Sequence, residues 1–166
     1  MSIRRFYDHW PQYNRRMTEV ITAMNDAELA IRPSPERWPI WATVGHTAAA
    51  RVYWLCGILR EPGSETTPWP QPNGEGWEDD LEQPRSAEEL TGALDTSWAI
   101  VDGVLERWTP DMLGDEIERD YGGVRRRHSR SSILQRLLTH DAYHCGELSQ
   151  TLGIHGLPQI DLWRPD

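Results

Sequence analysis

The segment His140-Asp-Ala-Tyr-His144 contains the side chains of this sequence that are best placed to do chemistry. Two histidines four residues apart lie on one face of a helix, one turn apart, so both imidazoles can reach a single metal ion. Two ligands make a weak site, and His46 offers a third. Three neutral imidazoles suit zinc, nickel, cobalt or iron, in that order of availability, and leave coordination positions open. A metal held in this way can polarise a carbonyl, or lower the proton affinity of a bound thiol or water.

The same histidines also have a simpler interpretation, as core residues that hydrogen-bond a backbone carbonyl or a buried carboxylate. His140 and His144 fall on the apolar stripe of a predicted helix, where an unpaired imidazole is costly. His46 lies in a predicted helix that is apolar on almost every side. A helical wheel therefore does not say whether His46 faces the other two, and periodicity leaves both interpretations open.

The histidine spacing also matches the His-Glu-x-x-His helix of metalloproteases, with Asp141 in the place of the glutamate base. Aspartate has a shorter arm, no third ligand follows in a protease-like context, and an all-helical protein lacks a strand edge to hold a peptide. We therefore exclude a protease. Asp141 and Glu147 are candidates to orient the histidine rings, or else surface or capping carboxylates. Arg51 and Tyr53 are candidates to line a cavity.

Four segments have the apolar periodicity of amphipathic helices and would position these residues. They are residues 6–24, residues 43–59, the segment from Ser86 to Trp108, and a segment that begins near Arg130–Ser132 and runs to about Leu152. Ser86 and Glu89 form a capping-box pattern at the start of the third helix. Four helices joined by two long connections predict an all-α four-helix bundle, formed by a single domain of residues 1–166.

The two long connections are expected to be mostly irregular. Residues 61–86 are rich in Pro, Gly and acidic residues, and their length suits a crossover along the outside of a bundle. Residues 111–130 contain Tyr121-Gly-Gly-Val124, which could form the turn of a short hairpin. The basic run Arg125–Arg127 has acidic neighbours, so we interpret it as a solvated loop or hairpin rather than a phosphate-binding patch.

Composition argues against several kinds of partner. The formal net charge of −9 does not suit nucleic acid or an anionic membrane, which bind to a basic surface. No apolar run approaches membrane-spanning length and residues 1–8 contain no apolar signal core, so the expected location is cytoplasmic. Cys56 and Cys145 fall within predicted helices and are expected to be buried without a disulfide. The remaining histidines have no partner pattern and are expected to be exposed; they are His9, His128 and His155.

Three stretches of the sequence, taken in order, resemble the DinB/YfiT-like family over essentially the whole chain. Arg32–Ala48 resembles the Pro-rich turn, tryptophan and first histidine that open the second helix of the family. Leu137–Leu148 resembles its His-x-x-x-His-x-Gly-Gln segment, and Gly153–Pro158 resembles its closing stretch. One departure is Glu147, which stands where many members have Gln and adds a charge that lies close to the metal or faces solvent.

The resemblance implies a four-helix bundle of up-up-down-down topology in which His46, His140 and His144 hold one divalent metal, zinc or nickel first of all. It also implies that His46 faces the other two histidines. Some relatives are transferases or isomerases that depend on mycothiol, bacillithiol or a glutathione-like thiol, and homodimers are common. The leading hypothesis is a metal-dependent S-transferase or isomerase that presents a small thiol to an electrophilic substrate.

Two other functions would use the same three histidines. One is metal-dependent hydrolysis of a small ester or amide. The other is a non-catalytic, metal-stabilised bundle of the stress-response type. The sequence identifies no catalytic residue besides the candidate metal ligands.

Overall fold

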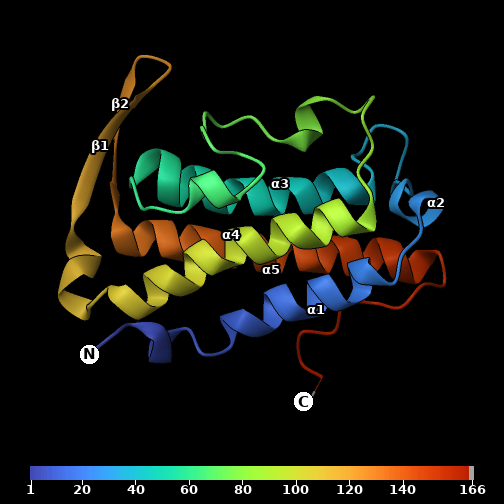
Figure 1. Ribbon diagram of the computed structural model, residues 1–166, viewed down its shortest axis with the longest axis horizontal. Coiled ribbons are helices and arrows are strands. Elements are labelled where there is room, and N and C mark those ends of the chain that lie inside the picture. The colour runs from blue at the N-terminus through green and yellow to red at the C-terminus, as the bar shows by residue number, and fades with distance from the viewer. Residues whose placement is uncertain (165–166) are drawn as a thin grey trace.

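The computed structural model describes residues 1–164 (Figure 1). Within this range, four long helices lie side by side, and a short helix precedes the second of them. The long helices are α1 (Trp10–Thr22), α3 (Ile40–Val52), α4 (Ala87–Arg107) and α5 (Arg130–Ile154), and the short one is α2 (Asp26–Leu29). The strands β1 (Glu116–Tyr121) and β2 (Val124–Ser129) pair as an antiparallel hairpin between α4 and α5. The protein is therefore mostly helical, and the prediction of an all-α fold is corrected by this small sheet.

Gly122 and Gly123 explain why a hairpin forms in a segment expected to be mostly irregular. Their φ angles are 61° and 79°, in the left-handed region that a tight two-residue hairpin turn requires and that glycine adopts without strain. Tyr121 pairs with Val124 directly across this turn, so the predicted hairpin turn is confirmed. Ion pairs across the two strands, such as Arg127 with Glu118, add to the stability of this pairing.

Two buried apolar clusters show the directions of the long helices. The first joins the ends of α1 and α5 to the starts of α3 and α4, and the second joins the opposite ends. Representative members are Ile21, Leu152, Ile40 and Leu90 in the first cluster, and Trp10, Leu134, Val52 and Val104 in the second. Consecutive long helices therefore run up, down, down and up, which the colours in Figure 1 also show, and the predicted up-up-down-down order is wrong. The long connection 61–86 allows this order, because it carries the chain back along α3 so that α4 runs parallel to it.

The boundaries of the helices follow from local capping. Ser86 and Glu89 form the predicted capping box, with Ser86 Oγ accepting from the Glu89 N–H at 3.3 Å. The helix ends at Arg107, before Trp108 and Pro110. Pro39 directly precedes α3, which begins at Ile40 rather than near Thr43. Among residues 1–164, no helix combines the length and apolar character needed to cross a lipid bilayer.

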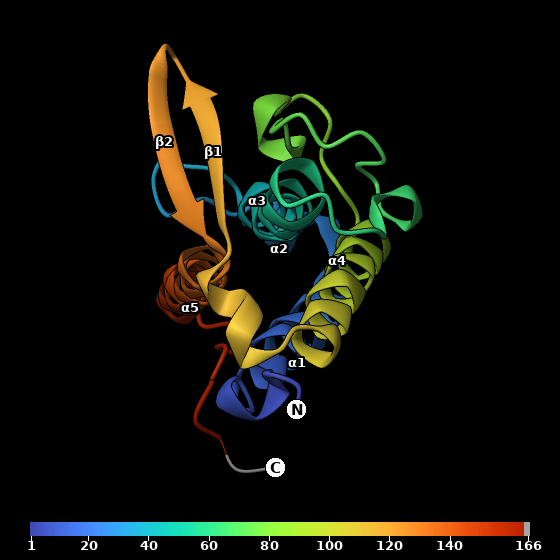
Figure 2. The same cartoon turned by 90° about the vertical axis from the view of Figure 1, so that its left-hand side faces the viewer.

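The connection 61–86 packs closely against α3 and its π-helical extension, Tyr53–Ile58. A Cβ added to Gly45 would lie 3.0 Å from the Trp77 ring, so this glycine lets the connection approach the helix. The connection contains two short 3-10 turns, Ser64–Thr66 and Trp77–Asp79, which corrects the expectation of no regular element. Figure 2 shows it covering one side of α3, while the hairpin rises from the start of α5 on the other.

Candidate metal centre

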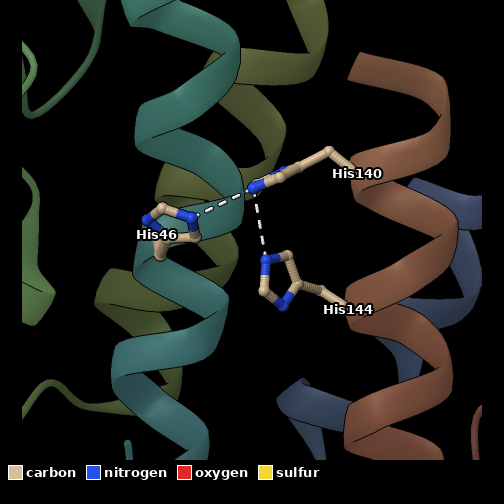
Figure 3. A group of neighbouring side chains, drawn as sticks. All are labelled: His46, His140 and His144. Carbon is tan, nitrogen blue, oxygen red and sulfur yellow. Dashed lines mark hydrogen bonds between the residues drawn. The ribbon is translucent and has the colours of Figure 1, made fainter. Parts of the chain in front are cut away.

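His46 on α3 and His140 and His144 on α5 point toward one another (Figure 3). The Nε2 atom of His140 lies 3.0 Å from Nε2 of His46 and 3.2 Å from Nε2 of His144. Ligand atoms of all three residues lie within 4.8 Å of one another. Metal–nitrogen bonds of about 2.0–2.1 Å in a tetrahedral zinc site place neighbouring nitrogens about 3.3–3.4 Å apart. Both His140 contacts lie within a few tenths of an ångström of this spacing, and the three histidines together could hold one metal ion.

Two carboxylates fix which nitrogen of each outer ring faces the centre. Glu147 Oε2 accepts a hydrogen bond from Nδ1 of His144 at 2.9 Å, and Glu78 Oε1 accepts one from Nδ1 of His46. Because a carboxylate only accepts, each of these rings has its proton on Nδ1, and its neutral form directs the Nε2 lone pair at the centre. Nε2 of His140 can then donate one proton to one neighbour at a time. A metal ion would satisfy all three lone pairs together, so the donor set fits a divalent cation.

The environment keeps the two α5 histidines in the neutral form that binds metals. Burial, together with the neighbouring His144 and His46 rings, lowers the pKa of His140 to about 3. Burial also lowers the pKa of His144, although the hydrogen bond to Glu147 acts in the opposite direction. Both rings are therefore in the neutral form near pH 7, and each has one nitrogen lone pair available to a cation.

His140 does not behave as an ordinary core histidine. Its Nδ1 atom is buried and has no hydrogen-bond partner within residues 1–164. Within the same range, the only hydrogen-bond partners of its Nε2 atom are the other two histidines. A core histidine is normally held by a carbonyl or carboxylate, since an unpaired buried polar atom costs about 1–3 kcal/mol. The incomplete pairing of His140 favours the metal interpretation over the core interpretation.

Comparison with known proteins identifies the family. The sequence profile of the DinB superfamily matches residues 12–148. This chain belongs to the DinB superfamily. The match includes all three histidines and confirms the resemblance that the sequence motifs indicate. The structure is similar to the crystal structure of a DinB-like protein from Bacillus cereus ATCC 10987, with a TM-score of 0.61, 22% identity and 96% of each chain covered. A comparison with curated proteins found no match.

Glu78 is a residue of this DinB site that the sequence did not reveal. It lies on the 3-10 turn Trp77–Asp79, within a connection that has no periodicity from which to infer direction. A Cβ on Gly76 would lie 2.1 Å from a carboxylate oxygen of Glu78, so the glycine leaves room for this side chain to bend back. No pattern in residues 61–86 distinguishes Glu78 from the other acidic residues of the connection. Glu147 contacts His144, which corresponds to the first of the two roles that the sequence left open for it.

Asp141 and Arg51 have a different role from the ones expected. Both side chains are fully buried, and Arg51 Nη2 donates to Asp141 Oδ2 at 2.9 Å. Trp10 Nε1 also donates to Asp141 at 2.7 Å, and Arg51 Nη1 donates to Asn14 Oδ1 at 2.7 Å and to Ser97 Oγ at 3.4 Å. Asp141 is therefore neither a surface carboxylate nor a partner of the histidines, and Arg51 does not line a cavity. The periodicity of α3 could not show this, because an arginine in a nearly all-apolar helix is compatible with several directions.

A cavity of about 290 Å³ opens beside the histidines, between α3, α5 and the connection. Its walls include His46, His140, Glu78, Arg136, Tyr53 and Trp54. The π-helical turn supplies the last two residues, so the prediction for Tyr53 is confirmed. A second cavity of about 220 Å³ reaches His144 and Glu147 from the other side. The histidine centre is thus accessible to small molecules.

Neither the two cysteines nor the remaining three histidines belong to the converging group among the described residues. Cys56 and Cys145 are buried free thiols, as predicted. Burial raises the pKa of Cys145 to about 12, so this sulfur stays protonated. His9 and His155 are exposed, as predicted, whereas His128 is half-buried against Trp54.

Proposed function

We propose that this DinB superfamily protein is a metal-dependent enzyme that transfers a small thiol to an electrophilic substrate, as an S-transferase or isomerase on a four-helix-bundle scaffold. His46, His140 and His144 would hold one divalent ion, and zinc or nickel suits three imidazoles best. The observation that carries the proposal is the convergence of three Nε2 lone pairs at the wall of an open cavity. A structural zinc site is normally closed by four protein ligands, whereas a catalytic site keeps an open position.

The residues of the chain would each contribute a defined part of this chemistry. A divalent ion would supply a positive charge that lowers the pKa of a thiol in the cavity, so that the thiol reacts at neutral pH. Glu78 and Glu147 hold two of the imidazole rings in the orientation required. Tyr53 and Trp54 form an aromatic wall that limits water beside the reacting atoms.

The thiol would come from a small molecule rather than from the protein. Cys56 and Cys145 are buried, and burial raises the pKa of both. Neither belongs to the group of ligand atoms that converge within residues 1–164. A protein whose own thiols are kept protonated and away from the centre suits an external thiol as nucleophile.

The first experiment measures metal per chain by elemental mass spectrometry. The variants are His46→Ala, His140→Ala and His144→Ala, with His9→Ala as the matched control because His9 is exposed and does not belong to the converging group. We expect near-stoichiometric zinc or nickel in the wild type and in His9→Ala, and loss of metal in the other three.

A thiol-transfer assay with an electrophilic acceptor then tests the reaction. Metal-loaded protein should exceed the rate of the free metal ion, and the three histidine variants should not. A wild-type chain that holds no metal and takes up neither added zinc nor nickel would overturn the proposal. A metal-dependent rate with an ester that needs no thiol would replace the transferase by a hydrolase.

A further inference from the structure

Two guanidinium groups lie over one indole ring at the wall of the cavity beside His46 and His140. Arg136 Cζ on α5 is 4.9 Å from the Trp54 ring centroid, and Arg119 Cζ on β1 is 4.7 Å from it. Arg136 lines the cavity together with His46 and His140. The hairpin, which rises beside the start of α5 (Figure 2), thus brings a second positive charge to the edge of the candidate site.

Two positive charges gather over Trp54 although the chain as a whole is acidic, with a net charge of −9. His128 on β2 meets Trp54 edge-on at 5.3 Å, and its Nε2 atom is buried without a hydrogen-bond partner among the described residues. Burial lowers the pKa of His128, and the charges of Arg119 and Arg136 lower it further. The two guanidinium groups therefore create a local positive field.

The acidic residues that line the cavity, Glu75 and Glu78, keep their negative charges, but their hydrogen bonds go to groups other than the two arginines. Glu78 accepts from His46, and Glu75 accepts from the Asn73 amide at 2.9 Å. Arg136 forms no ion pair with any residue of the range 1–164. Arg119 donates to the Tyr53 hydroxyl at 2.6 Å, while its Nε atom is buried without a partner in that range. By contrast, Arg127 elsewhere on the hairpin is paired with Glu116 and Glu118.

We propose that Arg136, assisted by the charge of Arg119, binds the anionic end group of the substrate or thiol, a carboxylate or a phosphate. The inference rests on the proposed function and narrows its substrate class. A guanidinium presents a planar fork that binds either anion bidentately, and the contact of Arg136 with the Trp54 ring holds its guanidinium at the cavity wall. Arg136 precedes His140 by one turn of α5, a rise of about 6 Å. The ligand is therefore a small anionic molecule whose charged group and reacting atom are a few bonds apart.

A titration of the full-length, metal-free protein tests this subsite independently of metal binding at the three histidines. The probes are succinate, methyl phosphate and the neutral succinamide, followed by the ¹⁵N–¹H signals of the Trp54 indole and the arginine side chains. The Trp54 signal is assigned with Trp54→Phe. We expect saturable shifts with at least one anion and none with succinamide, and the tighter anion identifies a carboxylate or a phosphate ligand.

Arg136→Gln should weaken anion binding at least tenfold, because it removes the charge and the fork. Arg136 is exposed, so this substitution leaves the core intact. The matched control is Arg126→Gln on β2, where Arg126 lies over Tyr121 and does not line the cavity. Equal affinity in wild type and Arg136→Gln, no saturable shift with either anion, or equal shifts with succinamide would each overturn the subsite.

Failure of the subsite and failure of the proposed function give different results. Arg136-dependent anion binding in a chain that takes up no metal would contradict the proposed function and leave the subsite standing. A chain that holds metal and transfers a thiol, but whose affinity for both anions is the same in Arg136→Gln, would overturn the subsite alone.

Discussion

Two polar clusters lie between α3 and α5, and the neighbouring residues His140 and Asp141 belong to different ones. In the cluster around Asp141, every donor meets an acceptor. Trp10 and Arg51 donate to the Asp141 carboxylate, and Arg51 also donates to Asn14. The charged side chains of Arg51 and Asp141 are both fully buried. In the histidine cluster, Nε2 of His140 lies 3.0 and 3.2 Å from two other imidazole nitrogens beside an open cavity, and its single proton can satisfy only one of them at a time. The first cluster is complete without a ligand. The second is incomplete and could hold a cation, so the pairing of the polar groups distinguishes the two clusters better than burial does.

The complete cluster joins all four long helices. Trp10 and Asn14 come from α1, Arg51 from α3, Ser97 from α4 and Asp141 from α5. Because α3 and α5 also carry the three histidines, this network fixes the relative position of the candidate ligands. The two clusters are thus linked, and substitutions should separate their contributions to stability and to metal affinity.

The largest effect is expected for Asp141→Asn, which removes the charge but keeps the size of the side chain. Breaking a buried ion pair leaves Arg51 as an uncompensated buried charge, which typically costs about 3–5 kcal/mol. Urea denaturation of the metal-free protein measures the change in the free energy of unfolding. Asp95→Asn, on the exposed face of α4, is the matched control and should change stability by less than about 0.5 kcal/mol. Similar values for the two variants would contradict a structural role for the network.

Added zinc should stabilise the protein through the histidine cluster. An ion that binds the folded state alone raises the free energy of unfolding by about 2.7 kcal/mol at a concentration of 100 Kd. Urea denaturation with zinc and with a chelator measures this increment in wild type, His140→Ala and His9→Ala. We expect the increment to vanish in His140→Ala and persist in His9→Ala. An unchanged increment in His140→Ala would place the zinc elsewhere.

Acid should destabilise the metal-free protein through His140. Its pKa is about 3 in the folded state, against about 6.5 in an unfolded chain, so between these values the unfolded state binds more protons. Stability therefore falls as the pH decreases through 6.5, and this residue contributes a loss of about 2 kcal/mol between pH 7.5 and pH 5. Urea midpoints across this range measure the loss. His140→Ala should flatten the curve, and an equal slope in that variant would assign the effect to other groups.

The sequence predicts best what depends on local geometry. Helical spacing alone brings His140 and His144 to one face, and the capping box locates the start of α4. The direction of His46 comes from the family resemblance, because α3 is apolar on nearly every side. The order of helix directions was not predictable, since connections as long as 61–86 and 111–130 permit more than one arrangement. Glu78 shares this limit, because its position depends on how an irregular connection folds back onto α3.

The smallest effects should distinguish the two carboxylates that orient the histidines. Glutamine keeps an oxygen that accepts from the histidine Nδ1–H but removes the charge. The Glu78 side chain is 8% exposed and that of Glu147 is 30% exposed, so the charge of Glu78 acts in a less polar environment. Glu78 Oε2 is also buried without a partner among residues 1–164, so Glu78→Gln would place an unsatisfied amide there if that atom became the nitrogen.

Glu78→Gln should therefore weaken zinc binding about tenfold, near the lower end of the range for residues that orient metal ligands. Glu147→Gln should weaken it only a few-fold, which agrees with the resemblance to family members that have Gln at this position. Competitive zinc titration against a chromophoric chelator measures both affinities. Equal losses would mean that the two carboxylates act through their hydrogen bonds alone. A larger loss for Glu147→Gln would mean that the partly exposed charge beside His144 contributes more to zinc affinity than the buried charge beside His46. Burial would then not determine which carboxylate has the larger effect on zinc binding.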